Sequence, residues 1–176
     1  MNTDNRLRTR RIVFSALVGA LYATITVLIV PPELSFYPIQ FRFAEALCLL
    51  PFFAPETILG LFVGCLISNL FSPFGPLDII VGSLATLLSV FLVSKIKIRW
   101  LTPVPVVLCN ALMVGAVLAY MENIPFFITA LQVGLGELAV CVLLGLPLLY
   151  SLSRVPYFRQ LFPEKFSGVH MGGETV

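Results

Sequence analysis

Charged side chains are scarce in this chain. Of its 176 residues, 59% are hydrophobic and only 11% are charged, and the mean hydropathy is +0.99. The stretch from residue 12 to residue 94 holds just five formally charged side chains, namely Glu33, Arg42, Glu45, Glu56 and Asp78. A water-soluble domain needs far more polar surface than this. The composition therefore predicts an integral membrane protein whose outer surface faces lipid.

The chain also lacks the common motifs of catalysis and metal binding. It contains no GxxxxGK[ST] phosphate loop, no GxSxG and no HExxH. Cys48, Cys65, Cys109 and Cys141 stand singly in apolar stretches, and the single histidine, His170, lies in a polar C-terminal tail. Without a CxxC or Cys/His spacing, the cysteines are best interpreted as small core residues. We expect no enzymatic activity, no metal and no cofactor in this chain.

What the sequence has in abundance is apolar runs, separated by proline, glycine and charge. The runs cover residues 12–30, 40–53, 56–71, 78–94, 104–121 and 126–150. Most are long enough to cross a bilayer as helices. The run 40–53, at about fourteen residues, is short, and a re-entrant element or a tilted helix would both fit it.

The distribution of positive charge favours six crossings. If the chain starts in the cytoplasm and crosses six times, ten of its eleven basic residues are cytoplasmic: Arg6, Arg8, Arg10, Arg11, Lys95, Lys97, Arg99, Arg154, Arg159 and Lys165. Merging residues 40–71 into one crossing would place the cluster at 95–99 outside. The sequence thus predicts an all-α, compact bundle of six transmembrane helices with both termini cytoplasmic. It comprises a basic segment (1–11), one membrane domain (12–153) and a tail (154–176).

Polar side chains inside these runs are the candidate site residues. A charge at the centre of a membrane helix costs at least ~2.5 kcal/mol, so it needs a partner, water or a function. The candidates are Gln40, Arg42, Glu45, Asn69, Asp78, Asn110, Tyr120, Gln132 and Glu137. They predict a solute pocket that opens outward. Because one arginine cannot balance three buried acids, the pocket favours a cationic or donor-rich solute. The alternative is internal pairing, for which Arg42 and Glu45 have helical i, i+3 spacing.

A stripe of small residues marks one face of the first predicted helix. It consists of Ser15, Ala16, Gly19, Ala20 and Ala23. Such a stripe allows another helix to approach closely. Spacing alone does not decide between a neighbour in the same bundle and a separate subunit.

Several short segments follow one another along the chain in a distinctive order: QFRFAEAL (40–47), LPF (50–52), Asn69 with SPFG (72–75), LDIIVGS (77–83), NAL (110–112), VGLGE (133–137) and GLP (145–147). These segments resemble the QueT family, the substrate-binding S components of energy-coupling factor (ECF) transporters for queuosine precursors. Together they cover about residues 10–150.

The resemblance implies a division of labour between subunits. The S component would capture its cargo outside a prokaryotic cell membrane. It would then dock through an Ala-xxx-Ala stripe, here Ala16 and Ala20 with Gly19 and Ala23 beside them, onto a transmembrane coupling subunit of the EcfT type. Two cytoplasmic ATP-binding cassette ATPases would supply the energy, which agrees with the missing phosphate loop.

The implied cargo is a 7-deazaguanine, that is, an aminomethyl or nitrile precursor or queuine. Its ring N–H and exocyclic amine can pair with one carboxylate, and an aminomethyl group adds a cation for a second. Phe36, Tyr37, Phe74 or Tyr120 could stack on its flat face. Three other hypotheses remain open from the residues: an S component for another vitamin or flat amine, an intramembrane enzyme using Glu45, Asp78 and Glu137, and a purely structural subunit.

Overall fold

A computed structural model describes residues 3–29 and 41–163 of the chain, and these residues form helices and connecting turns with no β-strand. In chain order the elements are α1 (Thr3–Thr24), η1 (Ile25–Ile29), η2 (Phe43–Phe52), α3 (Thr57–Asn69), α4 (Pro76–Lys95), η3 (Arg99–Leu101), α5 (Pro103–Glu122), α6 (Phe126–Val140), η4 (Cys141–Gly145), α7 (Leu146–Arg154) and α8 (Pro156–Leu161). The prediction of an all-α protein is confirmed for the described residues.

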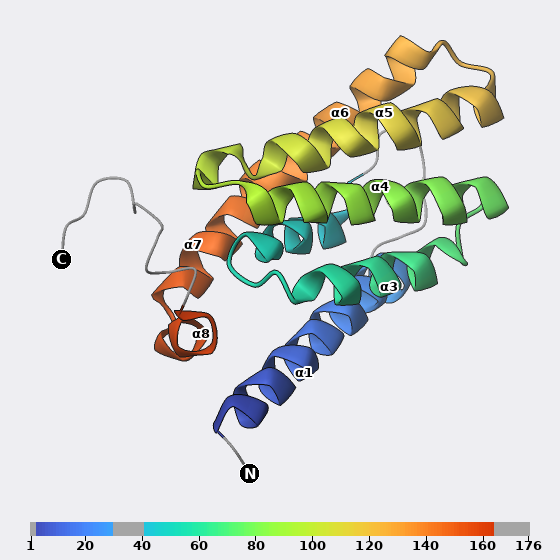
Figure 1. Cartoon of the computed structure of the whole chain (residues 1–176). Helices are drawn as coiled ribbons and strands as arrows, with labels where there is room; N and C mark the ends of the chain where they lie inside the picture. Colours follow the sequence, from blue (N-terminus) through green and yellow to red (C-terminus); the bar gives the residue numbers. More distant parts are fainter. Residues whose placement is uncertain (1–2, 30–40, 164–176) are drawn as a thin grey trace.

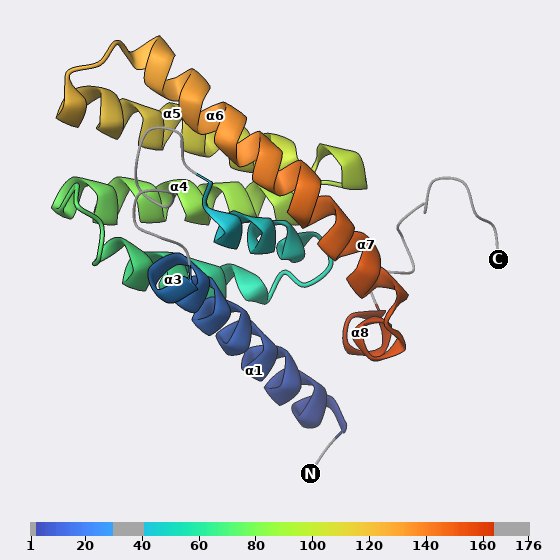
Figure 2. The ribbon, with the colours of Figure 1, turned by 180° about the vertical axis from the view of Figure 1, so that it is seen from behind.

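The long helices pack in the order in which the chain makes them. α1 packs on α3, α3 on α4, α4 on α5 and α5 on α6. α4, α5 and α6 lie side by side, and α1 runs obliquely across α3 (Figures 1 and 2). η4 joins α6 to α7 in one long rod that returns toward the start of α1. Short η2 sits inside this arrangement, where it contacts α1, α3, α4, α5, α6, η4 and α7.

Four helical stretches are long and apolar enough to cross a membrane. They are Asn5–Ile29, Pro76–Lys95, Arg99–Glu122 and Phe126–Arg154. The remaining two predicted runs form the shorter apolar helices η2 and α3. At about 2.0 Å per residue for a 3₁₀-helix and about 1.5 Å for an α-helix, each is about 20 Å long, against about 30 Å of hydrocarbon. The described residues therefore contain all six predicted helical segments, and four of these segments are long enough to span the bilayer.

The short helix η2 is the centre of the bundle. Every one of its residues except Phe43 is buried. A helix that is apolar on all sides can only be stable when it is surrounded by other helices. η2 is a 3₁₀-helix with Pro51 inside it, and proline lacks the amide hydrogen that a regular α-helix would use at that position. η2 is therefore a short helix that its neighbours enclose.

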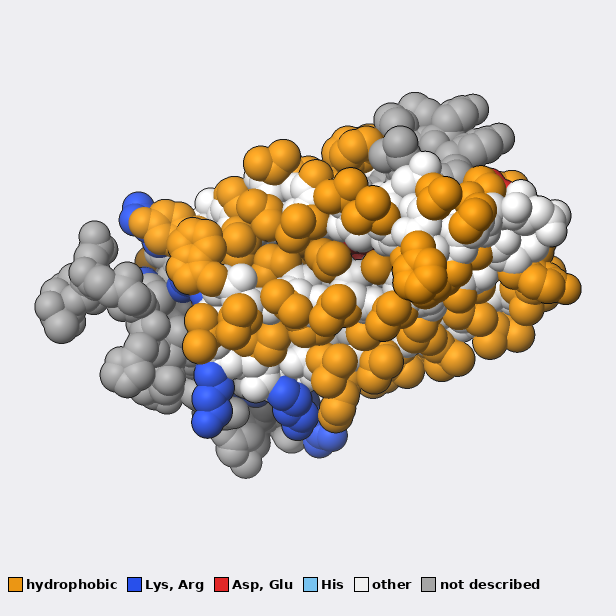
Figure 3. All heavy atoms as spheres, turned by 90° about the horizontal axis from the view of Figure 1, so that it is seen from above, with side chains coloured by type: hydrophobic (Ala, Val, Ile, Leu, Met, Phe, Trp, Pro, Cys, Tyr) orange, Lys and Arg blue, Asp and Glu red, His pale blue; other side chains and the backbone are white. Residues whose placement is uncertain are grey.

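The outer surface is apolar and the interior carries the polar groups. Leu28, Phe127 and Leu143 are 79%, 83% and 71% exposed, whereas Glu45 and Glu137 are 0% and 1% exposed. The face in Figure 3 is almost wholly hydrophobic, with Lys and Arg side chains gathered toward one end. This reversed distribution is the one that lipid stabilises, as the composition predicted.

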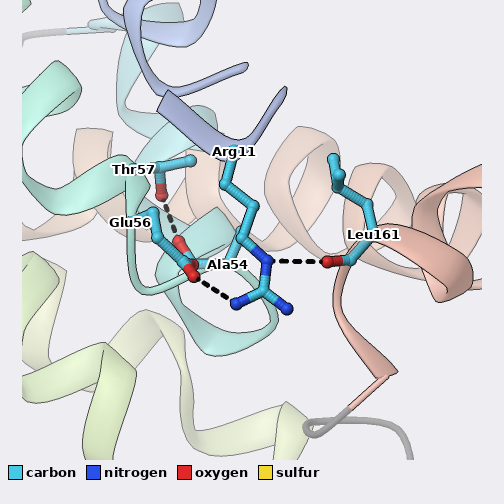
Figure 4. Close-up of polar contacts among 5 residues, drawn as sticks. All are labelled: Arg11, Ala54, Glu56, Thr57 and Leu161. Carbon is cyan, nitrogen blue, oxygen red and sulfur yellow. Dashed lines mark hydrogen bonds and ion pairs between the residues drawn. The ribbon is translucent and has the colours of Figure 1, made fainter. Parts of the chain in front are cut away.

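An ion pair joins three helices at the basic end of the bundle. Arg11 on α1 donates from Nη1 to Oε1 of Glu56, just before α3, and from Nε to the carbonyl of Leu161 on α8, both at 2.9 Å (Figure 4). Phe14 also packs edge-on against the ring of Phe158. α8 belongs to the segment that the sequence predicts as a cytoplasmic tail (154–176). Its Phe158 and Leu161 are buried, because its aromatic face packs on α1.

α1 and α3 cross with their backbones in close contact, and glycine makes this possible. A Cβ built on Gly60 would lie 2.0 Å from the carbonyl oxygen of Ser15, and one on Gly64 would lie 2.4 Å from that of Gly19. The Ser15 hydroxyl also donates to the Glu56 carbonyl at 2.7 Å and accepts from the Gly60 amide at 3.2 Å. In lipid, such close backbone packing replaces the hydrophobic drive that holds soluble helices together.

We therefore expect Gly60→Ala to destabilise the protein by about 1–3 kcal/mol, since the added methyl group must push two backbones apart. The measurement is unfolding of the detergent-solubilised chain. Gly134→Ala is the matched control, because a Cβ there meets nothing closer than the Ala111 methyl at 3.5 Å. Equal stability of the two variants would contradict this account of the crossing.

Candidate functional site

Six helices contribute polar side chains to one buried cluster. The members are Tyr22 (α1), Arg42 and Glu45 (the start of η2), Cys65 and Asn69 (α3), Asp78, Ser83 and Thr86 (α4), Asn110 (α5) and Glu137 (α6). All of them are buried. Helices distant in the sequence therefore meet at a polar interior that is enclosed by an apolar outer layer.

Glu45 is held by a tyrosine of α1. The Tyr22 hydroxyl donates to Oε1 of Glu45 at 2.5 Å, and both side chains are 0% exposed. The second carboxylate oxygen, Oε2, has no hydrogen-bond partner of good geometry among the described residues, and the weakly donating Cys48 thiol is the side chain beside this carboxylate. A buried carboxylate oxygen without a donor is costly, so this atom is a natural acceptor for a bound group.

Arg42 connects η2 to α3 and α4 through an asparagine. Its Nη2 donates to Oδ1 of Asn69 at 2.8 Å. The amide nitrogen of Asn69 in turn donates to the Asp78 carbonyl and to the Ser83 hydroxyl, both at 3.3 Å. Gly82 leaves room for this chain of contacts, since a Cβ there would lie 2.8 Å from the Asn69 amide nitrogen. The network fixes the guanidinium at the centre of the bundle.

Glu137 is the second acid of the interior. Glu45 and Arg42 lie close enough to act on its charge, and the Asn110 side chain of α5 lies beside its carboxylate as a hydrogen-bonding neighbour. That contact is poorly aligned, because by strict geometry neither Oε2 of Glu137 nor Nδ2 of Asn110 has a hydrogen-bond partner among the described residues. η4 begins one turn after Glu137, and Pro147 cannot donate to the carbonyl of residue 143, which accounts for the wider π-helical turn there.

Asp78 is bound locally. The Ser72 hydroxyl donates to its Oδ2 at 2.5 Å, and the residue lies in the first turn of α4, where a negative charge is favourable. The Asp78 carboxylate also attracts the Arg42 guanidinium electrostatically. Internal pairing thus applies to Asp78 through Ser72 and to Glu45 through Tyr22, and both acids also attract Arg42. No three carboxylate, thiol or imidazole groups in the described parts of the chain are placed to hold a metal ion.

A separate hollow lies on the outside of the α1–α3 crossing. It has a volume of about 920 Å³ and is lined by Ser15, Ala16, Gly19, Ala20, Glu56, Leu59, Gly60, Val63, Gly64 and Ile67 together with Leu7, Arg8, Arg11 and Ile12. Ala16 and Ala20 are exposed there, Gly19 is buried against α3, and Ala23 is half-buried. The small-residue stripe therefore does two things: part of it packs within the bundle, and part of it forms an open groove.

Comparison with known proteins identifies the family. A family model described as "QueT transporter" matches residues 12–154, which include all six helical segments and every member of the buried cluster. The chain belongs to the QueT transporter family. It is therefore a multi-pass membrane protein of a transport family, and not an enzyme.

One curated relative of this QueT-family chain is the "Queuosine precursor transporter QueT" of Lactococcus lactis subsp. cremoris (strain MG1363). The two are 40% identical over 94 residues. The aligned region covers 51% of this chain and 55% of the relative, so it spans about half the length of each. No solved structure matches the chain.

The structure brings most of the candidate site residues together, with three exceptions. Gln132 is half-buried on α6, and its Oε1 lacks a hydrogen-bond partner among the described residues. Tyr120 is 74% exposed near the C-terminal end of α5, so it lies apart from the buried cluster. Gln40 lies outside the described residues, as do Phe36 and Tyr37. Phe74 packs against the small apolar cluster around Leu118.

The sequence analysis missed Tyr22, Ser83 and Thr86. Tyr22 carries a usable signal, because a tyrosine near the middle of an otherwise apolar spanning helix needs a hydrogen-bond partner when it is buried. Ser83 and Thr86 carry none, since a membrane helix can satisfy a hydroxyl with its own backbone. The Thr86 Oγ1 in fact lies 3.2 Å from the Cys65 Sγ of α3. The spacing of residues along the sequence cannot reveal this contact.

The contact between Tyr22 and Glu45 leads to a stability prediction. Tyr22→Phe should destabilise the chain by about 1–3 kcal/mol, because it leaves a second oxygen of a buried carboxylate without a donor. Unfolding in detergent measures this. Tyr120→Phe removes the same atom from an exposed side chain and should change stability by less than about 0.5 kcal/mol. Similar losses in both variants would mean that the short contact contributes nothing.

Proposed function

We propose that this chain is the S component of an ECF-type importer, which captures a queuosine precursor outside the cell and delivers it with energy from separate ATPases. The observation that carries the proposal is the pair of buried acids Glu45 and Glu137. Each keeps one carboxylate oxygen without a hydrogen-bond partner among the described residues, inside a transporter-family bundle. The printed name of the Lactococcus relative supplies the cargo class.

The cargo fits the unsatisfied atoms of the cluster. A 7-deazaguanine offers a ring N–H next to an exocyclic amine, and two parallel donors of this kind match one carboxylate. A precursor with an aminomethyl group adds a cation, which a second acid would stabilise in a low-dielectric interior. Asn110 adds an amide donor for a ring carbonyl. An anionic cargo would instead meet two acids and one arginine.

The proposed topology has six crossings, with both termini in the cytoplasm and the chain in the cell membrane. Support comes from the ends of the helices. Contacts gather Arg11, Glu56, Arg99, Tyr150 and the residues of α8 at one end of the bundle. Six crossings place all of these on one side. The basic side chains then follow the positive-inside rule.

The groove between α1 and α3 is the proposed docking face for the coupling subunit. Ala16 and Ala20 offer a small-residue surface that a helix of another protein can approach closely. The floor is already made of backbone at Gly60 and Gly64. The two ATPases would then act through that subunit, and this chain itself needs neither a nucleotide site nor a cofactor.

Ligand binding to the purified chain tests the cargo. We expect an aminomethyl deazaguanine to bind more tightly than a panel of vitamins, and Glu137→Gln to weaken its binding about tenfold or more, because a charge-assisted hydrogen bond is lost. Glu122→Gln, at the end of α5, is the control and should bind normally. If a vitamin outside the deazaguanines binds and no deazaguanine does, the cargo assignment is overturned.

Substitutions in the groove test the docking face. Ala16→Trp or Ala20→Trp should reduce copurification with the coupling subunit and stop uptake, while the isolated chain keeps its solute affinity, because the indole fills the groove and not the interior. Leu21→Trp, on an exposed face of α1 outside the groove, is the matched control. A parallel loss of solute binding would assign Ala16 and Ala20 to packing within the bundle.

A further inference from the structure

A second hollow lies at the basic end, between the start of α1 and the terminal helix α8. Its volume is about 510 Å³, and its walls include Arg6, Arg10, Val13 and Leu17 of α1 with Tyr157 and Leu161 of α8. It is distinct from the proposed docking groove, because no residue lines both hollows. Neither the buried polar cluster nor the family assignment gives this hollow a role.

The two ends of this hollow differ in character. Arg6 and Arg10 are exposed and are one helical turn apart on α1. Val13 and Leu17 continue the same face toward the interior of the membrane, and they are 52% and 63% exposed. Along the helix, Arg10 and Leu17 are about 10 Å apart. Two arginine side chains therefore lie at one end of an apolar groove formed by Val13 and Leu17.

The positive charges of Arg6 and Arg10 are not balanced by other residues that line the hollow. None of the described residues that line it is acidic. The nearby acid Glu56 is paired with Arg11, which points to the other side of α1. Tyr157, 58% exposed on α8, adds an amphipathic ring at the same level, as tyrosines often do at the boundary between lipid and water.

We infer that this hollow binds one anionic phospholipid, with its headgroup phosphate between Arg6 and Arg10 and an acyl chain along Val13 and Leu17. Both parts of the ligand are needed to match the site. A free phosphate would leave the apolar groove of Val13 and Leu17 unused, and a zwitterionic lipid gains less from two arginines because its net charge is zero. The lipid would bridge α1 and α8, next to the ion pair of Arg11 that already joins these helices.

Native mass spectrometry of the full-length chain in detergent tests the site. Phosphatidylglycerol should remain bound at concentrations where phosphatidylcholine does not. The double variant Arg6→Ala/Arg10→Ala should weaken phosphatidylglycerol binding about tenfold or more, since each basic residue at the membrane surface contributes substantially to attraction for anionic lipid. Arg8→Ala is the matched control, because Arg8 lies between them in sequence but lines the docking groove on the other side of α1.

Three results would overturn the site. Equal retention of phosphatidylcholine would show that charge plays no part. An equal effect of Arg8→Ala would show diffuse attraction to the basic end, without a defined position. Binding that is seen only after deletion of residues 164–176, which include Glu164 and Glu174, would assign the hollow to the C-terminal segment of the chain itself. These outcomes do not depend on the cargo, so this inference and the proposed function can fail separately.

Discussion

Polar groups in the interior of this protein have to be satisfied by each other, because the surrounding lipid offers no hydrogen bonds. That constraint explains why so many helices converge on one point. Tyr22 serves Glu45, and Arg42 reaches α4 through Asn69. Removing any one member would leave a buried polar partner without its hydrogen bond in an apolar surrounding, so the members of the cluster depend on one another. The carboxylate oxygens that remain without well-aligned donors among the described residues are the atoms on which the proposed solute site rests.

The helix α1 links the buried polar cluster to the groove proposed as a docking face. Its inner face supplies Tyr22 to the cluster, and its outer face presents Ala16 and Ala20 to the groove. Ala20 and Tyr22 are about 3 Å apart along the helix axis. Gly19 fixes the helix against α3 between these surfaces, with the two backbones in direct contact. In the proposed assembly, a displacement of α1 by the coupling subunit would therefore move Tyr22 relative to Glu45.

Much of the fold could be predicted from the sequence, and the exceptions have identifiable causes. The six apolar runs all become helices, because proline and glycine interrupt them at the places where the structure turns. The 3₁₀ conformation and complete burial of η2 could not be predicted, since a short apolar run fits a buried core, a re-entrant loop or a tilted span equally well. The packing of α8 was missed because its aromatic residues have meaning only against Phe14 of α1.

By itself, the sequence determined that the protein is surrounded by lipid and that its fold is all-α. It also determined that the basic side chains gather at one end, and it identified the polar residues from which a site could be made. Those properties follow from composition and spacing along one chain. Only the tertiary structure decided that Asp78 is bound by Ser72 and that the small-residue stripe is divided between packing and a groove. It also decided that one carboxylate oxygen of Glu45 and one of Glu137 have no well-aligned hydrogen-bond partner among the described residues. The reason is physical: whether a buried polar atom is satisfied depends on which helices meet around it, and that is set by packing between segments far apart in the chain.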